Sequence, residues 1–219
     1  MDINKWKNYI ELLRDVPVDK DSLAAFSRLP STKKFMSTNA HLQPVAFTSC
    51  ITKNDSMDTF WNKTLKTPDT ITHTIALIRK DIMTYQYQNG DNQENDQKEW
   101  VPDFALIVQL GSQMNGFHNT VHGGLVAALL DECLGLTVEA IRSCFQSGAN
   151  GLVTSSPLYT ANLYINYRRP TESPGVYIVE ARLQRREGRK WMMQGRFRGE
   201  NGEVRADANS LWIAAVQKM

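Results

Sequence analysis

Residues 118–135, HNTVHGGLVAALLDECLG, combine a histidine, two glycines and an acid in an order that suits chemistry on a carbonyl group. Gly123 and Gly124 stand where an apolar, helix-like pattern begins, so their backbone N–H groups point out of the positive end of a helix. Such groups can stabilise a carbonyl oxygen that becomes negative. Asp131 is the complementary part, because a carboxylate acts as a general base or as a nucleophile.

The spacing within this stretch predicts how the chain assembles. Gly123 and Asp131 are eight residues apart, which is about 12 Å along a helix with a rise of about 1.5 Å per residue. One small carbonyl group cannot touch both. If both act on one substrate, they come from two copies of the chain, with the helices antiparallel across a twofold axis. We therefore expect an obligate homodimer with two shared sites, and pairing of dimers into a higher homo-oligomer stays open.

The helix has one face of small residues. At about 100° per residue, Gly124, Ala128, Asp131 and Gly135 fall within about 60° of one another. Small side chains beside a lone carboxylate leave space for a substrate to approach it. The alternative is that Asp131 and Glu132 lie on a solvated helix edge and that the glycines only allow close packing.

The elements around this helix predict an α+β fold. A strand is expected at 101–110 and the long helix at 124–145, and four further strand-like runs follow it. Those runs cover residues 158–169, 175–186, 190–199 and 204–216, with EGR and ENGE as hairpin turns between the last three. One helix followed by an antiparallel meander indicates a sheet that wraps the helix.

The first 57 residues are expected to form a helical N-terminal extension, which is a lid or a cover for a sheet edge, and residues 58–219 the main domain. The expected elements before residue 101 are helices near 2–15, 20–28 and 56–65, irregular polar chain over 30–44, a strand within 70–88 and an exposed loop over 89–99.

The composition narrows the class of protein. Of the 219 residues, 42% are hydrophobic and 22% charged, which is ordinary for a globular domain. The net charge of +2 gives no argument for a nucleic-acid partner. Three cysteines without paired spacing indicate neither a disulfide framework nor a zinc site. No run reaches the roughly 18 apolar residues of a membrane span, so we expect a cytoplasmic protein without stable membrane association.

Three segments resemble a known family. HGGLVAALLDE resembles the signature of hotdog-fold acyl-CoA thioesterases, and TANLYINYRRP, residues 160–170, is similar to the strand after the helix in the thioesterase superfamily member 4 branch. FWNKTLKTPDTI, residues 60–71, is similar to an upstream segment of fungal-type members. The resemblance covers about residues 58–216. It implies a hotdog domain with a central helix wrapped by five or six strands, pairing into a dimer with a continuous sheet.

The same resemblance implies an activity and roles for four residues. The activity is hydrolysis of an acyl-CoA or acyl-carrier thioester to the free acid and the thiol, without a cofactor. Gly123 gives the oxyanion N–H, and Asp131 is the base or the nucleophile. Thr160 positions the water or the carboxylate, and His122 supports the loop before the helix.

The chain departs from that family pattern just before the helix, where MNGFHNTV replaces a glycine-rich approach. Either Asn115 or Asn119 is a candidate to bind the thioester carbonyl, and Gly124 is a further candidate for substrate binding. Arg168 and Arg169 follow the strand that carries Thr160, so they are candidates for the CoA phosphates. The alternative for these arginines is a solvated strand end.

Other chemistries find less support in the sequence. His118 and His122 are four residues apart, but they precede the helix and have no third ligand nearby, so no metal is expected. No serine-hydrolase elbow or dinucleotide-binding motif occurs. Two functional alternatives stay open: a biosynthetic enzyme that uses the same groups for polyketide release, cyclisation or isomerisation, and a non-catalytic acyl-binding or regulatory module.

Overall fold

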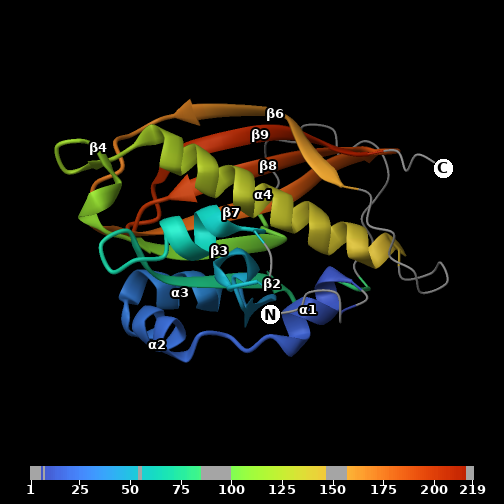
Figure 1. Cartoon of the computed structure of the whole chain (residues 1–219), viewed down its shortest axis with the longest axis horizontal. Coiled ribbons are helices and arrows are strands. Elements are labelled where there is room, and N and C mark those ends of the chain that lie inside the picture. Colours follow the sequence, from blue (N-terminus) through green and yellow to red (C-terminus); the bar gives the residue numbers. More distant parts are fainter. Residues whose placement is uncertain (1–5, 7, 54–55, 85–99, 147–156, 216–219) are drawn as a thin grey trace.

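The computed structural model describes residues 6, 8–53, 56–84, 100–146 and 157–215. One long helix, α4 (Gly123–Gln146), lies across one face of a seven-stranded antiparallel sheet (Figure 1). The strands are β1 (Leu42–Val45), β2 (Ile71–Arg79), β3 (Phe104–Leu110), β6 (Leu158–Tyr167), β7 (Gly175–Glu187), β8 (Lys190–Arg198) and β9 (Val204–Ala214). This layout confirms the α+β class and the hotdog arrangement.

The shorter elements lie before α4. They are α1 (Tyr9–Asp15), α2 (Lys20–Arg28), α3 (Pro30–Thr38), a 3-10 turn η2 (Thr48–Cys50), a π-helical turn η3 (Phe60–Thr64), a 3-10 turn η4 (Ser112–Met114), β4 (Asn115–Phe117) and β5 (Thr120–Val121). No helix in the part of the chain that the structure describes combines the length and apolarity needed to cross a membrane.

The core lies between α4 and the sheet. Leu129 and Leu134 of α4 are fully buried against inward residues such as Leu106 and Val179. Gly135 lies on the small face of the helix, but a Cβ there would meet the ring of Trp212 at 2.6 Å. This glycine therefore permits close packing of the helix on the sheet, as the alternative interpretation of the small face supposed.

Helices α2 and α3 of the N-terminal extension cover the opposite face of the sheet. Phe26 of α2 is fully buried against Ile75 and Ile107, and Phe35 of α3 packs beside them. The expectation of irregular chain over residues 30–44 is wrong, because this stretch forms α3 and β1. Pro30 occupies the first turn of α3, where its missing N–H costs no hydrogen bond. Figure 1 shows α2 and α3 beside each other, below the strands.

Three other expectations need correction. The strand order is β1-β2-β3-β7-β8-β9-β6, so only β7, β8 and β9 form a meander and β6 pairs with β9. Because α4 crosses the sheet (Figure 1), the chain re-enters it at the far edge. The helix expected at 56–65 is reduced to η3. The sheet has seven strands instead of five or six because β1 adds to the edge of β2. The loop at 89–99 lies outside the described residues.

Candidate active site

The start of α4 is capped by the side chain of His122. The Gly124 N–H donates to His122 Nδ1 at 2.9 Å, and the Leu125 N–H donates to the His122 carbonyl at 2.9 Å. Gly116 of the β4–β5 hairpin lies against the same ring, since a Cβ at Gly116 would be 2.9 Å from it. Because Nδ1 accepts a hydrogen bond, the proton of a neutral ring is on Nε2. This geometry fits a supporting role for His122.

Gly123 differs from Gly124 in what its N–H contacts. Gly123 is exposed, and among the described residues no hydrogen-bond acceptor is found for its N–H. Its carbonyl accepts a hydrogen bond of 2.9 Å from the hydroxyl of Tyr167, at the end of β6. The first N–H of the helix therefore stays open toward solvent, at the end where the helix dipole is positive.

Asp131 lies two turns further along the same face. Its Oδ1 accepts a hydrogen bond of 3.0 Å from the Thr160 hydroxyl of β6. The carboxylate is half-buried, and this burial raises its pKa above the ordinary value of 3.8 while the bond from Thr160 lowers it. A carboxylate with a raised pKa and an oriented oxygen is suited to take a proton from water.

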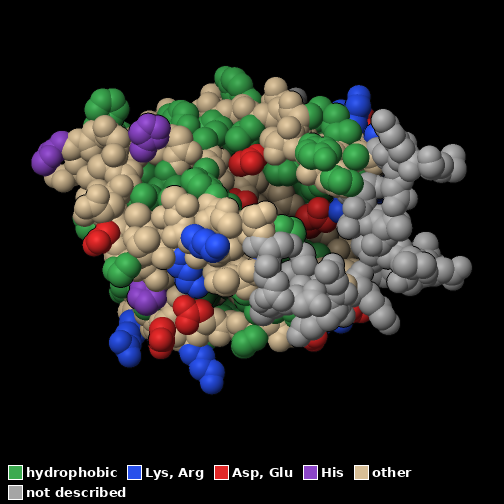
Figure 2. Space-filling model, in the orientation of Figure 1, with side chains coloured by type: hydrophobic (Ala, Val, Ile, Leu, Met, Phe, Trp, Pro, Cys, Tyr) green, Lys and Arg blue, Asp and Glu red, His purple; other side chains and the backbone are tan. Residues whose placement is uncertain are grey.

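One chain thus carries two groups of candidate residues on one helix face, which are called half-sites because the expected dimer would join them. The Gly123 end holds backbone donors, and the Asp131 end holds the carboxylate with Thr160. The strand β6 runs antiparallel to α4 and contacts both ends, through Tyr167 and Thr160. It is an edge strand of the sheet and exposes Tyr159, Tyr164 and Tyr167. Figure 2 shows hydrophobic side chains gathered over β6 and the adjoining stretch of α4.

A comparison with known families finds a match to the segment that contains α4 and β6. Residues 118–206 match the family model described as Thioesterase superfamily. This part of the chain is therefore similar to the thioesterase superfamily. The matched segment begins at the β4–β5 hairpin and ends in β9, so it includes the Gly123 end of α4, Asp131 and Thr160.

Individual proteins share 25–28% sequence identity with this chain over the segments that match. Verlamelin biosynthesis protein B of Lecanicillium sp is 28% identical over 173 residues, 70% of this chain and 71% of that protein. Acyl-coenzyme A thioesterase THEM4 of Bos taurus is 25% identical over 211 residues, 95% of this chain and 74% of that protein. A solved thioesterase superfamily protein, RHA08564, is 27% identical with a TM-score of 0.42 and covers 50% of each chain.

The two candidate asparagines before α4 have different surroundings. Asn119 has a φ of 49°, in the left-handed region that asparagine tolerates, and its carbonyl accepts a hydrogen bond from the Ser173 N–H. Its side chain lies 3.1 Å from His118 Nε2. Asn115 is exposed on β4. Asn119 therefore adopts the left-handed backbone conformation that a glycine often takes in a turn. Asn115 is the better candidate to bind the substrate.

The two arginines after β6, Arg168 and Arg169, also differ in their contacts. Arg168 forms an ion pair with Asp207, which alternates with buried Ala206 and Ala208 and so faces away from α4. Arg169 is exposed, and its backbone N–H donates to the Arg205 carbonyl at 3.1 Å. The guanidinium of Arg168 is already paired with Asp207 on the face of the sheet away from α4, so Arg169 is the better candidate to bind a phosphate.

The sequence analysis assigned no separate role to Glu132, the acid next to Asp131. Glu132 hydrogen-bonds the buried Ser49 of η2 and the Trp61 side chain of η3. Burial raises the pKa of Glu132 from 4.5 to about 7. Glu132 therefore joins α4 to η2 and η3, whereas its neighbour Asp131 faces the open side of the helix. No pattern in the sequence pairs Ser49 with Glu132, since 83 residues separate them.

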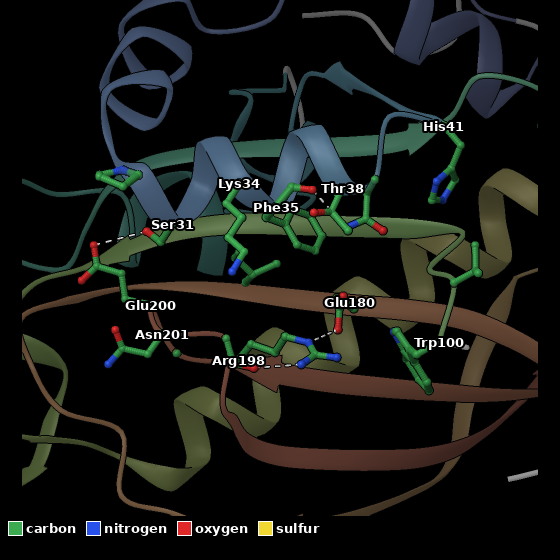
Figure 3. A pocket seen from close by; sticks show the side chains of 16 residues that line it. Ser31, Lys34, Phe35, Thr38, His41, Trp100, Glu180, Arg198, Glu200 and Asn201 are labelled. Carbon is green, nitrogen blue, oxygen red and sulfur yellow. Dashed lines mark hydrogen bonds and ion pairs between the residues drawn. The ribbon is translucent and has the colours of Figure 1, made fainter. Parts of the chain in front are cut away.

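A groove of about 780 Å³ lies on the other face of the sheet, away from Asp131. It runs between α3 and the outer side of β7 and β8 (Figure 3), and Lys34 and Trp100 stand on opposite sides of it. The buried Glu180 on its floor is paired with Arg198. The sheet separates this groove from both half-sites.

Proposed function

We propose that this protein hydrolyses an acyl thioester, carried by coenzyme A or by an acyl-carrier protein, to the free acid and the thiol. The observation that carries the proposal is the hydrogen bond from Thr160 to Asp131 on the half-exposed face of α4. It orients a carboxylate where water and an acyl group can reach it. The thioesterase-superfamily match and the relative named acyl-coenzyme A thioesterase support the same reaction.

The proposed reaction uses few groups. Asp131 takes a proton from water, and the oxygen of that water attacks the carbonyl carbon. The Gly123 N–H binds the resulting oxyanion, and the thiolate leaves with the proton from Asp131. In the alternative route, Asp131 attacks directly and the anhydride that forms is then hydrolysed. Hydrolysis in ¹⁸O-labelled water distinguishes them, because single turnover labels Asp131 only along the anhydride route.

The proposal includes a homodimer. Gly123 and Asp131 of one chain are about 12 Å apart on an ideal helix, so the Gly123 end of one copy must face the Asp131 end of another. The open edge of β6 supports pairing at this strand, since unpaired strand edges favour association. A twofold axis there brings two antiparallel α4 helices together.

The direct test measures thiol release from a panel of acyl-CoA and acyl-carrier thioesters. Asp131→Asn keeps the shape and a hydrogen-bond acceptor but removes the base, so we expect kcat to fall by at least about 10³-fold. Circular dichroism and gel filtration should be unchanged. Hydrolysis at the wild-type rate by this variant contradicts the proposal, and no turnover by the wild type on any thioester favours a binding or regulatory module.

The shared site has its own test. Gly123→Pro removes the N–H at the first helical position, where proline fits. A heterodimer of Asp131→Asn and Gly123→Pro chains contains one site with both groups intact, so mixing two inactive variants should restore activity. Native mass spectrometry confirms the heterodimer. Verified heterodimers without activity argue against a site that spans two chains.

A second candidate function is a biosynthetic reaction at the same groups, such as release or cyclisation of a polyketide. The relative named Verlamelin biosynthesis protein B favours it. The carboxylate and the N–H donor suit an enolate as well as a tetrahedral intermediate. Mass analysis of the product separates the cases: hydrolysis adds water to the acyl group, cyclisation releases thiol without adding water, and isomerisation leaves the mass unchanged.

A further inference from the structure

The peptide group between Gly123 and Gly124 is held at both of its ends. Its carbonyl oxygen accepts the hydrogen bond from the Tyr167 hydroxyl at 2.9 Å, and its N–H donates to His122 Nδ1 at 2.9 Å. Two consecutive glycines give the backbone wide conformational freedom. These two side chains remove much of that freedom at the first turn of α4.

The next peptide toward the N-terminus carries the donor proposed for the oxyanion. Its carbonyl, that of His122, accepts from the Leu125 N–H at 2.9 Å, which leaves the Gly123 N–H as its open end. The direction of this N–H depends on the torsions at Gly123, and the Tyr167 hydroxyl acts on the other side of the same residue. The Tyr167 ring is in van der Waals contact, since a Cβ at Gly123 would be 3.5 Å from it.

We propose that Tyr167 is a positioning residue for the oxyanion donor. Its hydroxyl holds the carbonyl of Gly123, and this fixes the backbone torsions so that the N–H of Gly123 points at the reacting carbonyl. This inference rests on the proposed function. Burial raises the pKa of Tyr167 above 10.0, so its hydroxyl stays protonated and able to donate at neutral pH. The hydrogen bonds through the peptide to His122 also polarise one another, which strengthens the restraint.

The test is Tyr167→Phe, which removes only the hydroxyl. A donor that matters mostly in the transition state affects kcat and leaves KM nearly unchanged. We expect a kcat lower by about fivefold to tenfold. Tyr164→Phe is the matched control, because Tyr164 stands on the same exposed strand opposite Asn209, on the face away from α4. It should leave both constants unchanged.

A double-mutant cycle separates positioning from a general structural role. In a Gly123→Pro background the donor is absent, so Tyr167→Phe should have no further effect on the residual kcat. An equal loss in both backgrounds, or a loss equal to that of Tyr164→Phe, overturns the inference and leaves the proposed function intact. A wild-type protein that hydrolyses no thioester overturns the proposed function and this inference with it.

Discussion

The two ends of the exposed face of α4 are held by different kinds of contact. At the Gly123 end most contacts are local, because His122 caps the helix two residues from Gly124. At the Asp131 end the contacts come from distant segments, with Thr160 29 residues away and Ser49 reaching the neighbouring Glu132. A glycine-rich helix start can be recognised in a sequence, but the surroundings of a helical acid depend on what packs beside it.

Among variants that leave Asp131 in place, the largest effect should come from the backbone donor at the Gly123 end. Gly123→Pro deletes one N–H, and we expect kcat to fall by about 10²- to 10³-fold. Gly123→Ala retains the N–H, and its Cβ would lie 3.5 Å from Tyr167, an ordinary contact. The alanine variant should therefore stay within about threefold of the wild-type kcat. An equal loss of kcat in the proline and alanine variants would show that the added side-chain volume causes the loss, and not the removal of the Gly123 N–H.

The buried acid next to Asp131 should make stability depend on pH. Folding raises the pKa of Glu132 from 4.5 to about 7, so the native state binds more protons than the unfolded state between these values. The free energy of unfolding should fall by about 3 kcal/mol as pH rises through this window. Urea denaturation across the pH range measures it.

Glu132→Gln is the control for that measurement, because it keeps a hydrogen-bond acceptor for Ser49 without the titration. Other buried carboxylates, such as Asp103, titrate in both proteins, so the difference between the two curves isolates Glu132. Curves that stay parallel from about pH 4.5 to 7 would mean that Glu132 has an ordinary pKa.

A smaller effect on kcat should come from the hydroxyl beside Asp131. Thr160→Val removes the hydrogen bond that favours the carboxylate, so the pKa of Asp131 should rise further. The acid limb of kcat/KM against pH then moves to higher pH, and kcat falls by about tenfold. Thr160→Ser keeps the hydroxyl and should keep the wild-type limb. An unmoved limb in the valine variant would separate Thr160 from the ionisation of Asp131.

Much of the fold followed from local patterns. The long helix and the four strands after it begin and end within two residues of their expected bounds, because apolar periodicity and the turns at EGR and ENGE are local signals. The place of β6 beside β9 and the pairing of β1 with β2 were not predicted, since strand partners depend on contacts between distant residues. The division of the chain at residue 57 stays a prediction.

A bulge in β6 explains why Tyr167 was not predicted. Strict alternation would place Thr160 and Tyr167, seven residues apart, on opposite faces of the sheet. The register shifts between Thr160 and Asn162, so one extra residue returns Tyr167 to the face of α4. Both side chains then reach the helix, one at each half-site.

The sequence by itself determined the parts with a local cause: the helix start at His122-Gly123-Gly124, the eight-residue separation from Asp131, and the acid on a face of small residues. The tertiary structure alone decided which groups surround them. It set Thr160 on Asp131, Tyr167 on the Gly123 carbonyl and Ser49 on Glu132. Helical periodicity fixes direction along one element, whereas these pairs depend on sheet order, a bulge and the packing of distant segments.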